Sequence, residues 1–152
     1  PLQAVWTDSN IPQPLCQLID QMKKYFQQSM ILSFRNNVLA PFKWDTTWTK
    51  DPHSQSAIDI SVPSIFRIVC ETQKPYHGYV IPNSINDSFF ANWNQSKYPE
   101  HITVYPIVSN KQVVGMILGT CAKTDAKSFQ LHHIESLASQ CAPLLTQSQL
   151  AA

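Results

Sequence analysis

The sequence is poor in glycine, in charged residues and in long apolar runs, and each shortage excludes a class of protein. Only 3 of its 152 residues are glycine, which excludes a glycine-rich loop that cradles a phosphate. Charged residues make up 14% of the chain, the net charge is +1, and no block of like charges occurs. Electrostatic capture of nucleic acid or of an anionic membrane is therefore excluded. The chain also has no signal-peptide pattern and no apolar run of about 18 residues.

Closely spaced cysteines are missing as well. The four cysteines, Cys16, Cys70, Cys121 and Cys141, form no C-x-x-C pair, which excludes a zinc ribbon and a thioredoxin-like motif. Each lies in an apolar run, so we expect buried free thiols rather than disulfides. Thiols of this kind are typical of a reducing compartment, and the predicted location is the cytoplasm, with no membrane contact.

No catalytic or metal-binding pattern is present either. The sequence has no G-x-S-x-G elbow. His132 and His133 are neighbours on a predicted helix, where their side chains point about 100° apart and cannot bind one metal ion. His53 and His101 have no partner at ligand spacing. Cys70 lies on an apolar helix face, where burial raises the pKa of a thiol and disfavours a nucleophile. We therefore predict no enzyme activity, no metal and no cofactor.

A β-hairpin is the clearest positive signal. Residues 102–122, ITVYPIVSNKQVVGMILGTCA, contain two β-rich apolar runs around residues 109–112, which we predict to be a four-residue turn. Pro106 cannot donate to a sheet ladder, and Gly115 permits a bulge or a close backbone approach. We expect this hairpin at the centre of an antiparallel sheet.

The other predicted elements alternate between helices and strands. A helix from Pro14 carries apolar residues at helical spacing, and strands at 30–34 and 38–44 flank a turn whose asparagines tolerate positive φ. A short strand at 58–62, a helix over 63–72 and a short strand at 76–81 follow. A brief helix capped by Asp87 or Ser88 and a final helix from Asp125 complete the order. Residues 1–13 form a linker, 14–146 a single domain and 147–152 a tail. Because the chain begins at Pro1, we expect a piece of a longer protein.

This order of elements resembles the GAF family of small sensory domains. Three segments carry the likeness: 64–78 (SIFRIVCETQKPYHG), 102–115 (ITVYPIVSNKQVVG) and the final helix from Asp125. Residues 75–93 look like a GAF-like variant of bacterial regulatory proteins. The resemblance implies an α+β fold, related to the PAS and profilin folds, with a central antiparallel sheet flanked by the N- and C-terminal helices. The bilin-attachment pair, the cyclic-nucleotide signature and the cysteine trio of free methionine sulfoxide reductases are missing from the sequence.

The resemblance also implies a regulatory domain of a larger bacterial signalling protein, which binds a small ligand or a partner protein. Aromatic side chains with polar tips suit a planar ligand, and an arginine suits an anionic group. The candidate ligand-binding residues are Arg67, Tyr76, His77, Tyr79, Phe89, Phe90 and Trp93. An alternative is that these aromatics fill the core, which would leave a ligand-free scaffold for protein interaction. A thiol-based reductase is a third hypothesis.

A homodimer through the terminal helices is the predicted assembly. The two helices carry more apolar surface than one sheet face needs to cover, and exposed stripes of this kind mark interfaces. The candidate interface residues are Leu15, Leu18, Met22, Phe26, Leu131, Ile134, Ala138 and Leu145.

Overall fold

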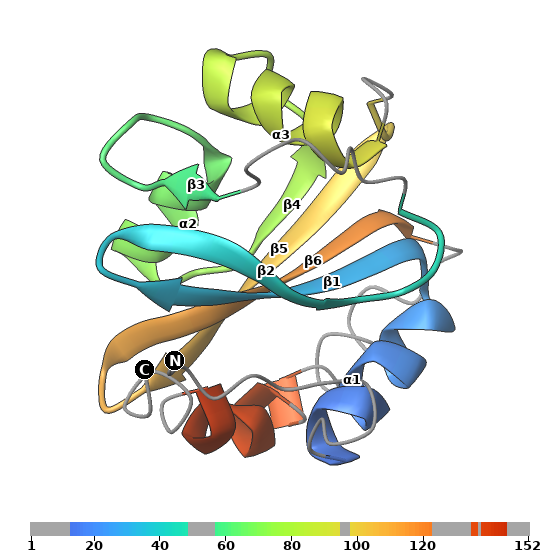
Figure 1. Ribbon diagram of the computed structural model, residues 1–152, viewed down its shortest axis with the longest axis vertical. Coiled ribbons are helices and arrows are strands. Elements are labelled where there is room, and N and C mark those ends of the chain that lie inside the picture. The colour runs from blue at the N-terminus through green and yellow to red at the C-terminus, as the bar shows by residue number, and fades with distance from the viewer. Residues whose placement is uncertain (1–12, 49–56, 95–97, 123–134, 137, 146–152) are drawn as a thin grey trace.

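A six-stranded antiparallel sheet organises the molecule (Figure 1). The structure, a computed structural model, describes residues 13–48, 57–94, 98–122, 135–136 and 138–145. The strands are β1 (Phe26–Arg35), β2 (Val38–Trp44), β3 (Ile58–Asp59), β4 (Tyr76–Tyr79), β5 (His101–Ser109) and β6 (Gln112–Ala122). Their order across the sheet is β3-β2-β1-β6-β5-β4, so the predicted hairpin contributes one of the two central strands. The predicted α+β fold with a central antiparallel sheet is confirmed.

Both long hairpins close with two-residue turns. Asn36 and Asn37 have φ values of 53° and 61°, and Asn110 and Lys111 have values of 52° and 64°. Positive φ at both central residues is the conformation that matches the right-handed twist of the flanking strands. The prediction of a four-residue turn over 109–112 was wrong, because residues 109 and 112 already pair with each other in the sheet.

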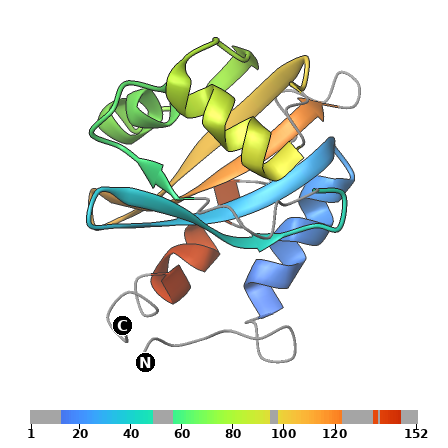
Figure 2. The ribbon, with the colours of Figure 1, turned by 45° about the horizontal axis from the view of Figure 1, so that its top comes forward.

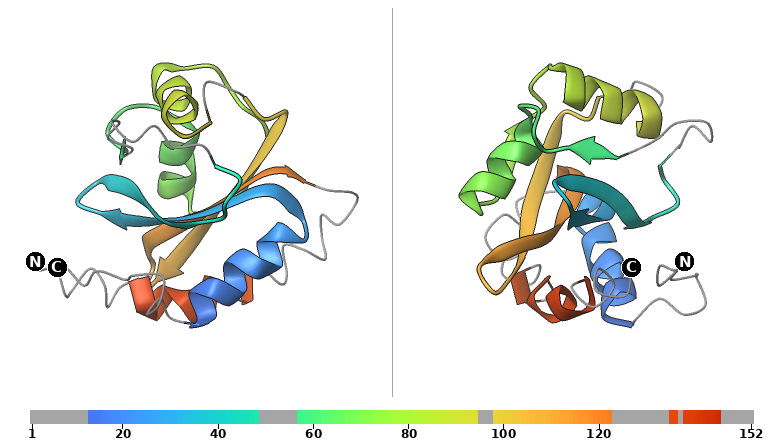
Figure 3. Two further views of the ribbon diagram at one scale, coloured as in Figure 1. Left: turned by 45° about the vertical axis from the view of Figure 1, so that its right-hand side comes forward. Right: turned by 60° about the vertical axis from the view of Figure 1, so that its left-hand side comes forward.

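Helices cover both faces of the sheet (Figures 2 and 3). The helix α1 (Gln13–Lys23) and the helical residues 135–136 and 138–145 lie on one face, and α2 (Ile65–Thr72) and α3 (Ser84–Asn94) lie on the other. The predicted start of α3 at Asp87 or Ser88 was wrong: Asn83 Oδ1 accepts the backbone N–H of Asn86 at 2.8 Å, so the helix begins at Ser84. The beginning of the predicted final helix lies outside the described residues. In the part of the chain that the structure describes, no helix combines the length and the apolar character needed to span a membrane.

Two hydrophobic cores lie on opposite faces of the sheet. The first, under α2 and α3, includes Met30, Leu32, Phe66, Phe89, Trp93 and Leu118. The second, under α1 and the C-terminal helical residues, includes Leu15, Met22, Ile31, Ile117, Cys141 and Leu145. Neighbouring residues of β1 and β6 point to opposite faces, so both strands contribute side chains to both cores.

The residues predicted as a dimer interface belong to the second core. The six that the structure describes are at most 3% exposed: Leu15, Leu18, Met22, Phe26, Ala138 and Leu145. These six side chains therefore do not form an exposed apolar stripe. The interface was predicted from such a stripe, and this premise was wrong at the described positions. The physical reason is that α1 and the C-terminal helical residues share one sheet face and one apolar cluster, so they bury each other as well as the sheet. Leu131 and Ile134 lie outside the described residues.

Candidate functional site

Three of the predicted ligand-binding aromatics lie in the interior. Phe89, Phe90 and Trp93 are 3%, 1% and 1% exposed and belong to the first core. The Trp93 ring packs edge-on against Trp44 at a centroid distance of 4.8 Å, and Phe89 lies 5.6 Å from Phe66. These rings occupy the space between the sheet and α3, as the alternative of aromatics that fill the core predicts.

The candidate residues of β4 do not join these aromatics in one pocket. Tyr76 is half-buried against the first core, and its hydroxyl donates to the carbonyl oxygen of Tyr79. His77 and Tyr79 are exposed, and alternation along the strand places them on the opposite face of the sheet from Tyr76. There the His77 Nδ1 atom lies 2.6 Å from the hydroxyl of Thr103, and the Tyr79 ring lies 5.1 Å from the ring of His101. The seven predicted residues are thus divided between the interior and two surfaces.

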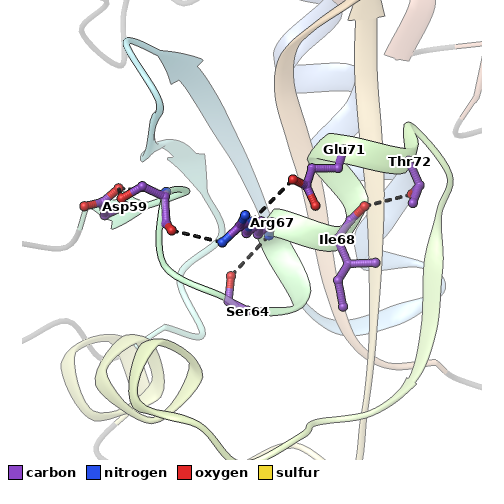
Figure 4. Close-up of polar contacts among 7 residues, drawn as sticks. Asp59, Ser64, Arg67, Ile68, Glu71 and Thr72 are labelled. Atoms are coloured by element: carbon purple, nitrogen blue, oxygen red, sulfur yellow. Dashed lines mark hydrogen bonds and ion pairs between the residues drawn. The ribbon is translucent and has the colours of Figure 1, made fainter.

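Arg67 is held on the outer side of α2 by the turn that follows β3 (Figure 4). Its Nη1 atom donates to the carbonyl oxygen of Ser61 at 3.0 Å, and its Nε atom donates to Glu71 Oε2 at 3.4 Å. Asp59 shapes the turn, because its Oδ1 atom accepts the Ser61 hydroxyl at 2.7 Å and the Ser61 backbone N–H at 2.9 Å. These two hydrogen bonds lower the pKa of Asp59, since they favour the charged carboxylate.

The helix that carries Arg67 has a well-defined start and end. Ser64 Oγ accepts the backbone N–H of Arg67 at 3.2 Å, which satisfies a donor in the first turn of α2. Gln73 closes the other end with a φ of 55°, and its N–H donates to the carbonyl oxygen of Val69 at 2.8 Å. Together these caps fix the position of Arg67 relative to the sheet.

Two grooves meet at the Arg67–Glu71 pair. The first, which we name the hairpin groove, has a volume of about 470 Å³ and lies between α2 and both hairpin turns; its lining includes Phe34, Asn37, Arg67, Cys70, Glu71 and Lys111. The second, the isoleucine groove, has a volume of about 440 Å³ and lies between α2 and the segment before α3; its lining includes Pro63, Ile65, Arg67, Ile68, Glu71 and Ile81. Arg67 and Glu71 line both grooves, which are therefore adjacent.

The hairpin groove combines apolar walls with charged groups. Its charged lining residues are Arg67, Lys111 and Glu71. Gln73 Nε2 donates to the carbonyl oxygen of Lys111 at 2.8 Å, which ties the end of α2 to the β5–β6 turn. Cys70 also lines this groove, but burial and then the charge of Glu71 raise its pKa, so the thiol stays protonated at neutral pH. The groove is thus suited to binding rather than to thiol chemistry.

The isoleucine groove is bordered by two exposed aliphatic side chains. Ile68 on α2 is 52% exposed, and Ile81 before α3 is 49% exposed. Neither residue was predicted from the sequence to be part of a binding site. A signal was present, because α2 carries apolar residues at 65, 66, 68 and 69, more than one face of a two-turn helix can bury.

In the described ranges, no three histidine, cysteine, aspartate or glutamate side chains are grouped so that they could hold a metal ion. The four cysteines are all described, and none of them forms a disulfide.

Comparison with solved structures identifies the fold. The sequence matches no protein-family model, and no curated protein is detectably similar to it. The chain is similar to the GAF domain of a GAF domain/HD domain protein from Geobacter sulfurreducens, with a TM-score of 0.67 and 12% identity over 91% of this chain and 93% of that one. It is also similar to the GAF domain of a two-component sensor histidine kinase from Bacillus halodurans, with a TM-score of 0.65 and 17% identity over 95% and 97% of the two chains.

An enzyme is found among the similar structures as well. The type II free methionine-R-sulfoxide reductase from Thermoplasma acidophilum matches with a TM-score of 0.61 and 14% identity over 89% of each chain. Since identities this low are evidence of fold alone, the comparisons establish that the chain has a GAF-like fold, as the sequence resemblance implied.

Proposed function

We propose that this chain is a regulatory domain of a larger bacterial signalling protein and that it acts by binding a partner protein at the outer face of α2. The observation that carries this proposal is the contrast between the two sides of the helix layer. Phe89, Phe90 and Trp93 fill the interior, whereas Ile68 and Ile81 remain exposed beside Arg67. Exposed apolar surface rimmed by polar groups is typical of protein–protein contact sites.

A regulatory role is supported by the fold. The GAF domain from Bacillus halodurans belongs to a two-component sensor histidine kinase. Cys70 and Cys141 are poor candidates for the reactive thiol of a reductase, because burial raises the pKa of both thiols.

Dimerisation and location remain predictions. A homodimer through α1 would have to use exposed polar residues such as Gln17, Asp20 and Lys23, because Leu15, Leu18, Ile19 and Met22 are buried. A cytoplasmic location is consistent with four cysteines that form no disulfide.

Photo-cross-linking tests the proposed binding face. A photoreactive phenylalanine analogue is introduced at position 68 or 81 of the full-length protein in its host cell, and cross-linked species are identified by mass spectrometry. Position 108 is the control, because Val108 is also exposed but lies on β5. We expect the same protein to be captured from positions 68 and 81 and not from position 108.

A ligand screen tests the alternative that the domain binds a small molecule. A ligand that binds only the native state raises the thermal unfolding midpoint. We expect no compound in a library of nucleotides and metabolites to do so for the isolated domain. Stabilisation by such a compound, together with equal cross-linking at all three positions, would show that the domain is a small-molecule sensor and that the proposal is wrong.

A further inference from the structure

We infer that the hairpin groove and the isoleucine groove form one two-part docking site, and that its occupant is a partner segment in which a carboxylate side chain lies next to an aliphatic one. The inference rests on the proposed function and adds the chemistry of the partner. Its basis is that one residue pair, Arg67 and Glu71, lines both grooves, so a single extended segment can contact both.

Arg67 retains hydrogen-bonding capacity for a carboxylate. A guanidinium carries five N–H donors in a planar fork. Among the described residues, the side chain of Arg67 has two acceptors, the Ser61 carbonyl and the Glu71 carboxylate (Figure 4). The Ser61 contact fixes the orientation of the guanidinium, while the remaining N–H groups are available to an incoming anion.

The Arg67–Glu71 ion pair can be opened by a competitor. Its single Nε–Oε2 contact measures 3.4 Å, and the Glu71 side chain is 61% exposed. Exposed i,i+4 pairs of this kind contribute little to stability, because water and salt screen them. A partner carboxylate that makes two parallel hydrogen bonds to the guanidinium would replace the weaker contact.

Lys111 adds a second positive charge to the lining of the hairpin groove. The bond from the Gln73 side chain to the Lys111 carbonyl oxygen holds the Lys111 backbone in place. With Arg67 and Lys111 opposed by Glu71 alone, the charged lining has a net charge of +1 and favours an acidic segment over a basic one.

The isoleucine groove supplies the apolar half of the site. Ile68 and Ile81 are each about half exposed and line this groove together with the buried residue Ile65. An aliphatic side chain placed between them would remove apolar surface of both partners from water. Because the two grooves share a border at Arg67, the carboxylate and the aliphatic side chain of the partner are expected to lie close together in the sequence of the partner segment.

Peptide display tests the inference directly. Short random peptides displayed on phage are selected against the isolated domain after its folding has been verified by circular dichroism. We expect the enriched sequences to carry aspartate or glutamate within a few positions of leucine, isoleucine or valine. One such peptide is then labelled, and its affinity is measured by fluorescence anisotropy.

Removing a favourable contact of the site should weaken peptide binding, whereas removing the competing carboxylate of Glu71 should tighten it. Arg67→Gln, Lys111→Gly and Ile81→Ser should each weaken binding, with a loss of about tenfold for Arg67→Gln. Lys111→Gly is informative because glycine suits the φ of 64° at this position, so lost binding cannot reflect a weaker hairpin. Glu71→Gln should tighten binding, since it frees the guanidinium; a merely structural role of Arg67 would not produce this sign.

Two control variants match these changes outside the site. Arg35→Gln removes the other arginine of the chain, and Val108→Ser removes an exposed aliphatic side chain of β5. Both should bind the peptide like the unmodified domain.

Each contrary result has a distinct meaning. Enriched peptides that lack acidic residues but respond to Ile81→Ser would overturn the inference and leave the proposed binding face intact. Peptides unaffected by any groove variant, or the absence of enrichment, would overturn the inference. If, in addition, a small molecule stabilised the domain and cross-linking were equal at positions 68, 81 and 108, the proposed function would fail as well.

Discussion

Gly115 lies where β6 closely approaches the backbone of β1. A Cβ atom there would lie 2.5 Å from the carbonyl oxygen of Leu32 and 2.7 Å from Cδ1 of Leu145. Because the first of these atoms belongs to the backbone of β1, we expect Gly115→Ala to lower the free energy of unfolding by roughly 1–3 kcal/mol in urea denaturation. Gly78→Ala is the control, since its closest contact is 3.2 Å to the hydroxyl of Tyr76, which can move away. Equal losses in both variants would contradict this explanation.

Cys141 makes the stability of the domain sensitive to alkaline pH. Burial raises the pKa of its thiol from 9.0 to about 11. A folded-state pKa above the unfolded value means that the stabilising contribution is complete below pH 9 and is lost as pH rises through about 11. We expect the free energy of unfolding to fall more steeply over this range in the unmodified domain than in Cys141→Ala. Parallel pH profiles would show that this thiol does not contribute.

At the scale of single elements, the cap of α2 can be tested separately from its packing. Ser64 is 4% exposed, and its hydroxyl accepts the Arg67 N–H. We expect Ser64→Ala to destabilise the domain by about 1 kcal/mol, measured by chemical denaturation, because the N–H loses its acceptor. Ser64→Asp should recover part of the loss, since aspartate is also a good cap. Ser88→Ala, an exposed change within α3, should have an effect within a few tenths of a kcal/mol; a similar loss there would contradict the capping argument.

Most elements were predictable because their signals are local. Each signal depends on a few neighbouring residues: the asparagines of the first hairpin turn, the apolar spacing of α1, and the proline before α2. The start of α3 was missed because Asn83, Asp87 and Ser88 are all good caps, and only the contact from Asn83 Oδ1 to Asn86 distinguishes them. The two-residue turn was missed because Lys111 has no intrinsic preference for positive φ; the paired strands impose it.

At the scale of the whole molecule, local signals no longer suffice. The apolar stripe of α1 is compatible with an interface or a core, and the choice depends on packing against the helical residues around Ala138, which are distant in sequence. The same ambiguity affected Trp93, whose ring suits a pocket wall as well as a filled interior. Arg67 was a candidate from the sequence and stays a prediction. The exposure of Ile68 and Ile81 required the tertiary structure, because only the packing around α2 shows which apolar residues are left outside.

The alternating side chains of the central strands have a mechanical consequence. Ile117 lies in one core, while its neighbours Met116 and Leu118 lie in the other, and Ile31 has the same relation to Met30 and Leu32. Because close-packed interiors resist compression, a displacement of these strands that starts under α2 must displace the contacts under α1 as well. Binding at the outer face of α2 that displaces β1 and β6 would thus also displace α1 and the C-terminal helical residues on the opposite face of the sheet.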